Sequence, residues 1–176
     1  MAKLFGSRLF RKGDKIIEDI ALKMMCTEEE APEFDPGMVV SDEEILDDLK
    51  GVKDLEARDR DGRTLLINAA FYGRKSAVEW LLRNGANVAA TDYGEFTALH
   101  AAAQEGFDDI IELLIAAGAP INARDDNGNT PLIISEYRSA IEILARNGAD
   151  ANIKNNHGIS ARDMFENYPD ILSLFK

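Results

Sequence analysis

Histidine, cysteine and clustered carboxylates are the side chains best suited to catalysis or metal binding, and this sequence has few that could act together. His100 and His157 are its two histidines, and Cys26 is its one cysteine. His100 has no serine or cysteine with which to build a nucleophilic relay. One cysteine excludes an internal disulfide and a closed cysteine-based zinc site, and the acids near Cys26 disfavour its thiolate. We therefore interpret Cys26 as buried or incidental, and we expect no catalytic residue, no metal and no cofactor.

Two segments, 59–62 and 125–128, have the Asp-x-(Asp or Asn)-Gly spacing that occurs in a calcium-binding loop. Such a loop needs carboxylates at positions 1 and 12 when its glycine is at position 6. Neither segment has them, because those positions are Ala57, Asn68, Ala123 and Ile134. Asp-x-x-Gly is instead ordinary turn chemistry, in which glycine takes a positive φ. The sequence also lacks a Gly-rich phosphate loop, a Gly-x-Ser-x-Gly elbow and a paired-histidine metal motif, so we do not expect an enzyme.

The turns recur with a period of 33 residues, and other positions share this period. The repeated sets are Asp59, Asp92 and Asp125; Thr64, Thr97 and Thr130; and Leu66, Leu99 and Leu132. Each unit continues to a glutamate, Glu79, Glu112 or Glu142, and then to a Gly-Ala pair at 85–86, 118–119 or 148–149. The last of these spacings is 30, so the third unit has lost three residues between Leu132 and Glu142. A fixed period of this length is typical of a stacked-repeat architecture.

Each unit is predicted to be a turn followed by two helices. The repeated threonines suit the N-cap of the first helix, and Pro131 suits a first helical position. Apolar residues of the second helix have helical spacing, as in Val78, Leu81 and Leu82. Glycines are expected to end the helices: Gly73 and Gly106 the first ones, and Gly85, Gly118 and Gly148, as C-caps, the second ones. The sequence therefore predicts an all-α chain, with 133–140 as the segment that departs most from the ideal unit.

The pattern Asp-x-x-Gly-x-Thr-x-Leu-His-x-Ala-Ala, followed by Gly and then by Leu-Leu-x-x-Gly-Ala, resembles the ankyrin repeat. The segments 98–102 and 130–132 carry most of its helix-opening motif, and 33 residues is the ankyrin period. Departures are Ile67 and Ile133 at the place of His100, and Gly94 one place early in its turn. The resemblance covers 59–153 and continues weakly to 176. It implies an ankyrin-like solenoid of stacked helix-turn-helix repeats, in which His100 has a structural role between neighbouring turns.

We expect two regions along the chain. Residues 1–40 hold an N-terminal helix that Asp14 can cap, and an acidic connector. Residues 41–176 form the ankyrin-repeat domain, with an N-cap at 41–58, repeats at 59–91, 92–124 and 125–153, and a C-cap at 154–176. In the N-cap, Ser41 and Glu44 suit a capping box before a helix that ends at Gly51.

The N-terminal region leaves two pairs of alternatives open. From Thr27 to Leu49 there are ten acidic side chains and no lysine or arginine. This run is either a solvated connector and helix face, which we favour, or a docking surface for a basic partner. Leu4, Phe5, Leu9 and Phe10 stand among four basic residues. They either lie on a membrane surface or, as we favour, belong to a tail or a helix that covers the end of the stack.

The formal net charge is −12, and because the first twelve residues carry four positive charges, the rest carries −16. Such a body repels nucleic acid phosphates and anionic membranes, and it attracts basic proteins. The N-terminus lacks the apolar core of a secretory signal, no apolar run is long enough to span a bilayer, and a lone cysteine fits a reducing compartment. We expect a cytoplasmic protein, monomeric on its own, that binds another protein.

The resemblance implies that binding uses a concave surface built from the turn tips and the outer faces of the first helices. Carried over residue by residue, the partner-binding positions are Arg60, Asp61, Arg63, Phe71 and Tyr72 in the first unit, Tyr93, Phe96, Gln104 and Glu105 in the second, and Asp126, Asn127 and Asn129 in the third. The four aromatics have no evident core role, and aromatics are frequent binding hot spots. They either anchor a partner or cover the N-terminal segment of this chain.

We predict a scaffold or adaptor module that binds a protein partner through this surface. The alternative is a stoichiometric inhibitor, such as an immunity or antitoxin protein that neutralises a basic toxin or enzyme. Small size, strong acidity and the absence of an effector domain favour the alternative.

Overall fold

The computed structural model describes residues 14–25 and 40–175, so Cys26, the basic N-terminal segment and the connector up to residue 39 lie outside the described residues. The described residues form ten helices and no strand beyond three isolated β-bridges at the turns. The helices are α1 (Asp14–Met25), α2 (Asp42–Leu49), α3 (Leu65–Phe71), α4 (Lys75–Arg83), α5 (Ala98–Glu105), α6 (Asp108–Ala116), α7 (Pro131–Ile134), α8 (Arg138–Arg146), α9 (Ala161–Met164) and α10 (Pro169–Leu172).

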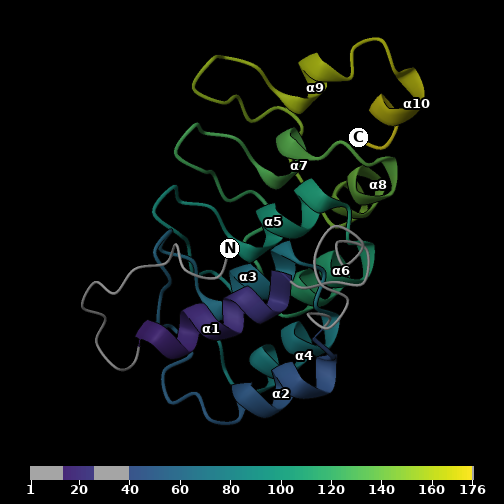
Figure 1. Cartoon of the computed structure of the whole chain (residues 1–176). Coiled ribbons are helices and arrows are strands. Elements are labelled where there is room, and N and C mark those ends of the chain that lie inside the picture. The colour runs from purple at the N-terminus through teal and green to yellow at the C-terminus, as the bar shows by residue number, and fades with distance from the viewer. Residues whose placement is uncertain (1–13, 26–39, 176) are drawn as a thin grey trace, which may run out of the picture.

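The helices stack in two rows (Figure 1). In the first row α1 contacts α3, α3 contacts α5, α5 contacts α7, and α7 contacts α9. In the second row α2 contacts α4, α4 contacts α6, and α6 contacts α8. The turns before α3, α5, α7 and α9 project beyond the first row on one side (Figure 1). The chain is the all-α solenoid that the sequence predicts.

Side-chain caps fix where the first helices begin. The hydroxyls of Thr64, Thr97 and Thr130 accept hydrogen bonds from backbone N–H groups three residues on, at 3.3–3.4 Å. Pro131 occupies the first turn of α7, where no amide hydrogen is needed. Ser160 and Asp163 form a reciprocal capping box at the start of α9.

The second helices end one residue earlier than predicted. Their C-caps are Asn84, Ala117 and Asn147, and the glycine after each takes a left-handed φ of 88° to 92°. The turn before α5 has its glycine one place early, and Glu95 consequently adopts φ 59°, the one positive φ of a non-glycine residue in the described ranges. This conformation is costly for a residue with a Cβ.

The core lies between the two rows and between successive units. It consists mainly of Leu, Ile and Ala side chains, among them Leu66, Leu99, Leu114, Leu132 and Leu144, which are almost fully buried. The alanines of α5 let adjacent first helices approach closely. The third unit is shortened as expected, because α7 has four residues and the chain leaves the helix at Ser135.

Helix α1 occupies the place of a first helix at the N-terminal end of the stack. It buries Ile17, Ile20, Ala21 and Met24, and it contacts both α3 and α2. Arg74 fixes its end: Nε donates to the Met24 carbonyl oxygen at 3.0 Å, and Nη1 lies 3.4 Å from Asp42 Oδ1 of α2. The predicted boundaries of the individual units remain predictions.

Candidate protein-binding surface

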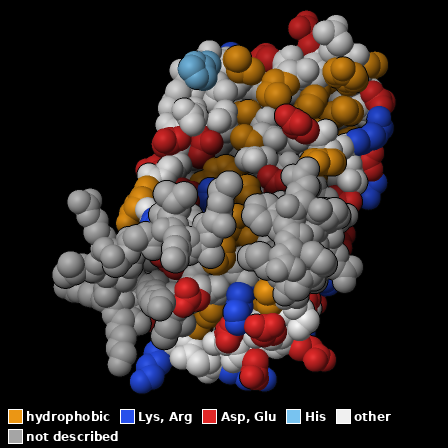
Figure 2. Space-filling view, in the orientation of Figure 1, with side chains coloured by type: hydrophobic (Ala, Val, Ile, Leu, Met, Phe, Trp, Pro, Cys, Tyr) orange, Lys and Arg blue, Asp and Glu red, His pale blue; other side chains and the backbone are white. Residues whose placement is uncertain are grey.

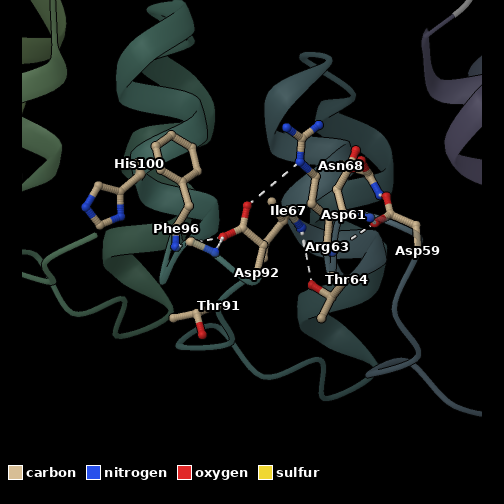
Figure 3. A network of polar contacts seen from close by, with 12 residues as sticks. Asp59, Asp61, Arg63, Thr64, Ile67, Asn68, Thr91, Asp92, Phe96 and His100 are labelled. Carbon is tan, nitrogen blue, oxygen red and sulfur yellow. Dashed lines mark hydrogen bonds and ion pairs between the residues drawn. The ribbon is translucent and has the colours of Figure 1, made fainter. Parts of the chain in front are cut away.

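A single aspartate oxygen organises each of the three central turns. Asp59 Oδ1 accepts from the N–H groups of Asp61 and Arg63, both at 2.9 Å. Asp92 Oδ1 accepts from Gly94 and Phe96 at 2.8 and 3.0 Å, and Asp125 Oδ1 from Asn127 and Asn129 at 2.9 and 2.7 Å. Figure 3 shows the first two turns side by side. The repeated aspartates therefore build turns, as their spacing predicts.

Backbone hydrogen bonds join one turn to the next. Tyr93 N–H donates to the Asp61 carbonyl at 3.4 Å, and Asp126 N–H donates to the Gly94 carbonyl at 2.9 Å. The turn tips are thereby aligned along one edge of the stack. Their outward side chains include the exposed carboxylates of Asp61, Glu95 and Asp126.

His100 is a structural residue of the second unit. Its Nδ1 accepts from the Thr97 N–H at 3.2 Å, and its Nε2 lies 3.1 Å from the Asn129 carbonyl oxygen of the next turn. These partners define the neutral Nε2–H tautomer. Burial lowers the pKa of His100 below its ordinary value, and this effect outweighs the hydrogen bond to Asn129. Because the ring has no exposed surface, it cannot act on a substrate.

Four predicted positions of the first unit, Arg60, Asp61, Arg63 and Tyr72, line a groove of about 390 Å³ together with residues of α1. Arg60 donates two hydrogen bonds to the Glu18 carboxylate of α1, from Nε to Oε1 at 2.7 Å and from Nη2 to Oε2 at 2.9 Å. The apolar side chains at its α1 wall include Leu22 and Met25, which are 55% and 40% exposed. A partner that contacts the first unit here therefore also contacts α1.

Arg63 and Phe71 pack against each other. The Arg63 guanidinium carbon lies 5.0 Å from the centre of the Phe71 ring, and the Phe71 ring meets Tyr72 edge-on at 5.1 Å. Arg63 Nε lies 3.9 Å from Asp92 Oδ2, too far for a hydrogen bond. These residues are half-buried, so part of their surface holds the first unit together.

Tyr93 and Phe96 differ in exposure although both stand near a turn tip. Tyr93 is 73% exposed, and its ring lies against Gly62, where a Cβ would come within 2.6 Å of the ring. Phe96 is half-buried and stacks on His100 with ring centres 5.0 Å apart. Tyr93 is thus the aromatic that the turn presents outward.

The remaining predicted residues are polar. Gln104 and Glu105 end α5, with the Gln104 amide 3.2 Å from Glu105 Oε1. Asp126 and Asn127 are exposed, and the Asn127 side-chain amide donates a hydrogen bond to Asp126 Oδ1 at 2.8 Å. Asn129 is half-buried, and its side-chain amide donates to Asp125 Oδ2 at 3.2 Å. Asp126 and Asn127 are available at the surface, whereas the Asn129 side chain is hydrogen-bonded to Asp125 of its own turn and to Asn155 of the next.

Comparison with known protein families settles the family. A family described as "Ankyrin repeats (3 copies)" matches residues 91–155, and one described as "Ankyrin repeat" matches residues 61–93. Together the matches run from 61 to 155, more than half of the chain. The chain belongs to the ankyrin repeat family. Ankyrin repeats imply a protein–protein interaction module.

The ankyrin portion is similar to parts of other proteins. It is 34% identical over 99 residues to an ankyrin repeat-containing protein of Schizosaccharomyces pombe, covering 56% of this chain and 48% of that one. It is 32% identical over 105 residues to a palmitoyltransferase of Saccharomyces cerevisiae, covering 57% and 14%. It is 33% identical over 85 residues to the human protein phosphatase 1 regulatory subunit 27, covering 47% and 55%. The chain thus spans about half or less of these relatives.

The sequence patterns did not single out a further group of exposed apolar side chains on the stack. Tyr137, Met164 and Tyr168 are 50%, 44% and 56% exposed near its C-terminal end. Figure 2 shows hydrophobic side chains gathered over α7–α10 with acidic side chains between them. The available signal was the three-residue deletion in the third unit, which marks where the surface departs from the repeat.

Two kinds of site are absent from the ranges that the structure describes, 14–25 and 40–175. No three His, Cys, Asp or Glu side chains converge there as a metal site requires. No helix there is long and apolar enough to cross a membrane.

Proposed function

We propose that this ankyrin stack is a non-catalytic, cytoplasmic adaptor or scaffold module that binds a protein partner through its first-row helices and turn tips. The observation that supports this proposal most directly is the exposure of Tyr93 and Tyr137, each of whose rings lies against a glycine of the preceding unit, Gly62 or Gly106. A half-exposed aromatic that is already held in place loses little conformational entropy on binding. Such side chains are typical binding hot spots.

The residues proposed as contacts fall into two groups. Tyr93, Asp61, Asp126, Asn127 and Gln104 are exposed and can meet a partner directly. Arg60 is also exposed but is paired with Glu18 of α1, and the half-buried residues Arg63, Phe71, Tyr72, Phe96, Glu105 and Asn129 contribute through partly exposed surface or by shaping it. The exposed acids at the turn tips favour a partner with a basic surface.

The test is affinity capture with the full chain, followed by binding measurements on the captured partner. Tyr93→Ala combined with Tyr137→Ala should weaken binding by about 2 kcal/mol or more, mainly through faster dissociation. The melting temperature should change little, since both side chains are at least half exposed. The control is Glu112→Ala with Arg146→Ala, two exposed positions on the second row. If the control variant lost binding while the tyrosine variant bound fully, the first-row face would not be the binding surface.

A second candidate is a stoichiometric inhibitor of a basic protein. The net charge of −16 outside the first twelve residues favours it, because an acidic body speeds association with a basic target. An inhibitor should abolish its partner's activity at a one-to-one ratio, whereas an adaptor leaves that activity intact. Raising the salt concentration should slow association more than it speeds release. An association rate that does not change with salt would contradict the electrostatic role.

A further inference from the structure

The shortened third unit leaves a hollow in the first-row face. Helix α7 has four residues where α5 has eight, so it is shorter by about 6 Å along its axis. The hollow of about 520 Å³ opens between the end of α5, the end of α7 and Met164 of α9. The three-residue deletion therefore creates a feature that the neighbouring repeats do not share.

The hollow is acidic at its rim. Of the residues that line it, Glu105 and Glu136 are carboxylates and none is a lysine or arginine. Arg138, which follows the lining residue Tyr137 in the chain, forms ion pairs with Glu142 at 3.0 Å and with Asp170 at 2.5 Å. Both rim carboxylates belong to a body of strong negative charge. Charge complementarity therefore favours a cation in the hollow.

The hollow also has a fixed aromatic wall. The Tyr137 ring lies against Gly106, where a Cβ would come within 2.5 Å of it, and half of the side chain is exposed. Ser135 lines the same hollow, and its buried hydroxyl has no hydrogen-bond partner. A flat aromatic face, two carboxylates and an unpaired hydroxyl together match a planar guanidinium, which stacks on rings and donates several hydrogen bonds.

We propose that the hollow between α5, α7 and α9 is a specificity subsite that receives an arginine side chain of the protein partner. The guanidinium stacks on the Tyr137 ring and pairs with Glu105 and Glu136, and the aliphatic stem lies along Met164. This inference rests on the proposed binding function and adds the chemistry of one partner residue.

The test is a titration of the full, isotope-labelled chain by NMR with three acetylated and amidated peptides. They are Gly-Gly-Arg-Gly-Gly and the same peptide with lysine or with citrulline, the neutral isostere of arginine. The arginine peptide should shift the amide resonances of residues 134–137 and of the Gln104 side chain. The citrulline peptide should bind about fivefold more weakly or worse, because it lacks the charge. Equal binding of citrulline, or tighter binding of lysine, would overturn the assignment.

Matched variants locate the site. Glu105→Gln with Glu136→Gln should weaken arginine-peptide binding by about fivefold or more, whereas Glu43→Gln with Glu112→Gln removes the same charge elsewhere and should not. Tyr137→Leu should weaken binding and Tyr168→Leu should not. The same spectra report whether each variant is folded. If the peptide shifts the amide resonances of α2 instead, or if all variants bind it equally well, the assignment of the subsite is wrong. The proposed function would stand separately if partner binding still depended on Tyr93.

Discussion

At the scale of single residues, His100 is a residue type suited to catalysis or metal binding, but here its ring has a structural role. The ring joins the second turn to the third through the Asn129 carbonyl, and it is neutral in the folded state. The unfolded chain has no such burial, so its histidine takes up a proton near the ordinary pKa of about 6.5. The two states therefore bind different numbers of protons at pH values between the lowered folded-state pKa and the ordinary pKa.

We predict that this difference makes stability depend on pH. The contribution of neutral His100 to the free energy of unfolding is complete above a pH of about 6.5. It is lost as the pH falls toward the lowered folded-state pKa, because the unfolded state binds the proton first. The slope is at most about 1.4 kcal/mol per pH unit for one group. Urea midpoints between pH 7.5 and 5.5 should fall less steeply for His100→Gln than for the unaltered chain. His157→Gln, at an exposed position, is the control, and parallel profiles for all three proteins would refute the prediction.

At the scale of the helices, α1 is held by contacts that come from distant parts of the sequence. Arg74 bonds the Met24 carbonyl, Arg60 grips Glu18, and Lys23 Nζ lies 2.6 Å from Asp48 and 2.8 Å from Glu44 of α2. The two carboxylates hold the pKa of Lys23 above its usual range. Arg74 is the most buried of these three cations, with a side chain 13% exposed.

We predict that Arg74→Ala lowers the free energy of unfolding by about 1 to 3 kcal/mol, since it removes charged hydrogen bonds from a largely buried position. Amide hydrogen exchange in α1 should rise more than exchange in α5. Arg83→Ala is the matched control: Arg83 is exposed and pairs with Glu79 within α4, so the change should cost less than about 0.5 kcal/mol. Equal gains in exchange in α1 and α5 would show that Arg74 supports the whole stack rather than α1.

At the scale of the whole molecule, stability is close to a sum over neighbouring units, because the main contacts among the described helices run within a unit or from one unit to the next. The two ends differ. The N-terminal end buries Ile17, Ile20, Met24, Ile45 and Leu49. The C-terminal end has two four-residue helices, α9 and α10, with Ala161, Phe165 and Ile171 as its buried apolar residues. The smaller apolar area leaves the C-terminal end less stable.

We predict that the stack opens from its C-terminal end. In native-state hydrogen exchange followed by mass spectrometry, the amides of 161–175 should exchange faster than those of α1 and α2, and α5 and α6 should exchange most slowly. Leu99→Ala, at a fully buried site between units, should lower stability by about 2 to 5 kcal/mol and speed exchange across the central units. Faster exchange in α1 and α2 than in 161–175 would contradict this order.

Much of the fold could be predicted from local chemistry. The 33-residue period, the threonine caps and the glycines after the helices define the units, because caps and turns depend on residues a few positions apart. The sequence also predicted the shortened third unit. It placed the second-helix ends one residue late, and it did not anticipate the positive φ of Glu95. Both differences concern a single residue at a helix end or turn.

The sequence by itself determined the family, the repeat architecture and the acidic character of this protein. Only the tertiary structure decided the position of α1, the exposure of Tyr137 and the hollow that the deletion leaves. Tyr93 and Phe96 are three residues apart and both aromatic, yet one is 73% exposed and the other stacks on His100. Whether an aromatic is a contact or a packing element depends on what lies against it. Tyr93 lies against Gly62 of the preceding unit, whereas Phe96 stacks on His100, which is itself joined to the Asn129 carbonyl of the following unit. Local sequence fixes caps and periods, whereas burial is set by contacts between units.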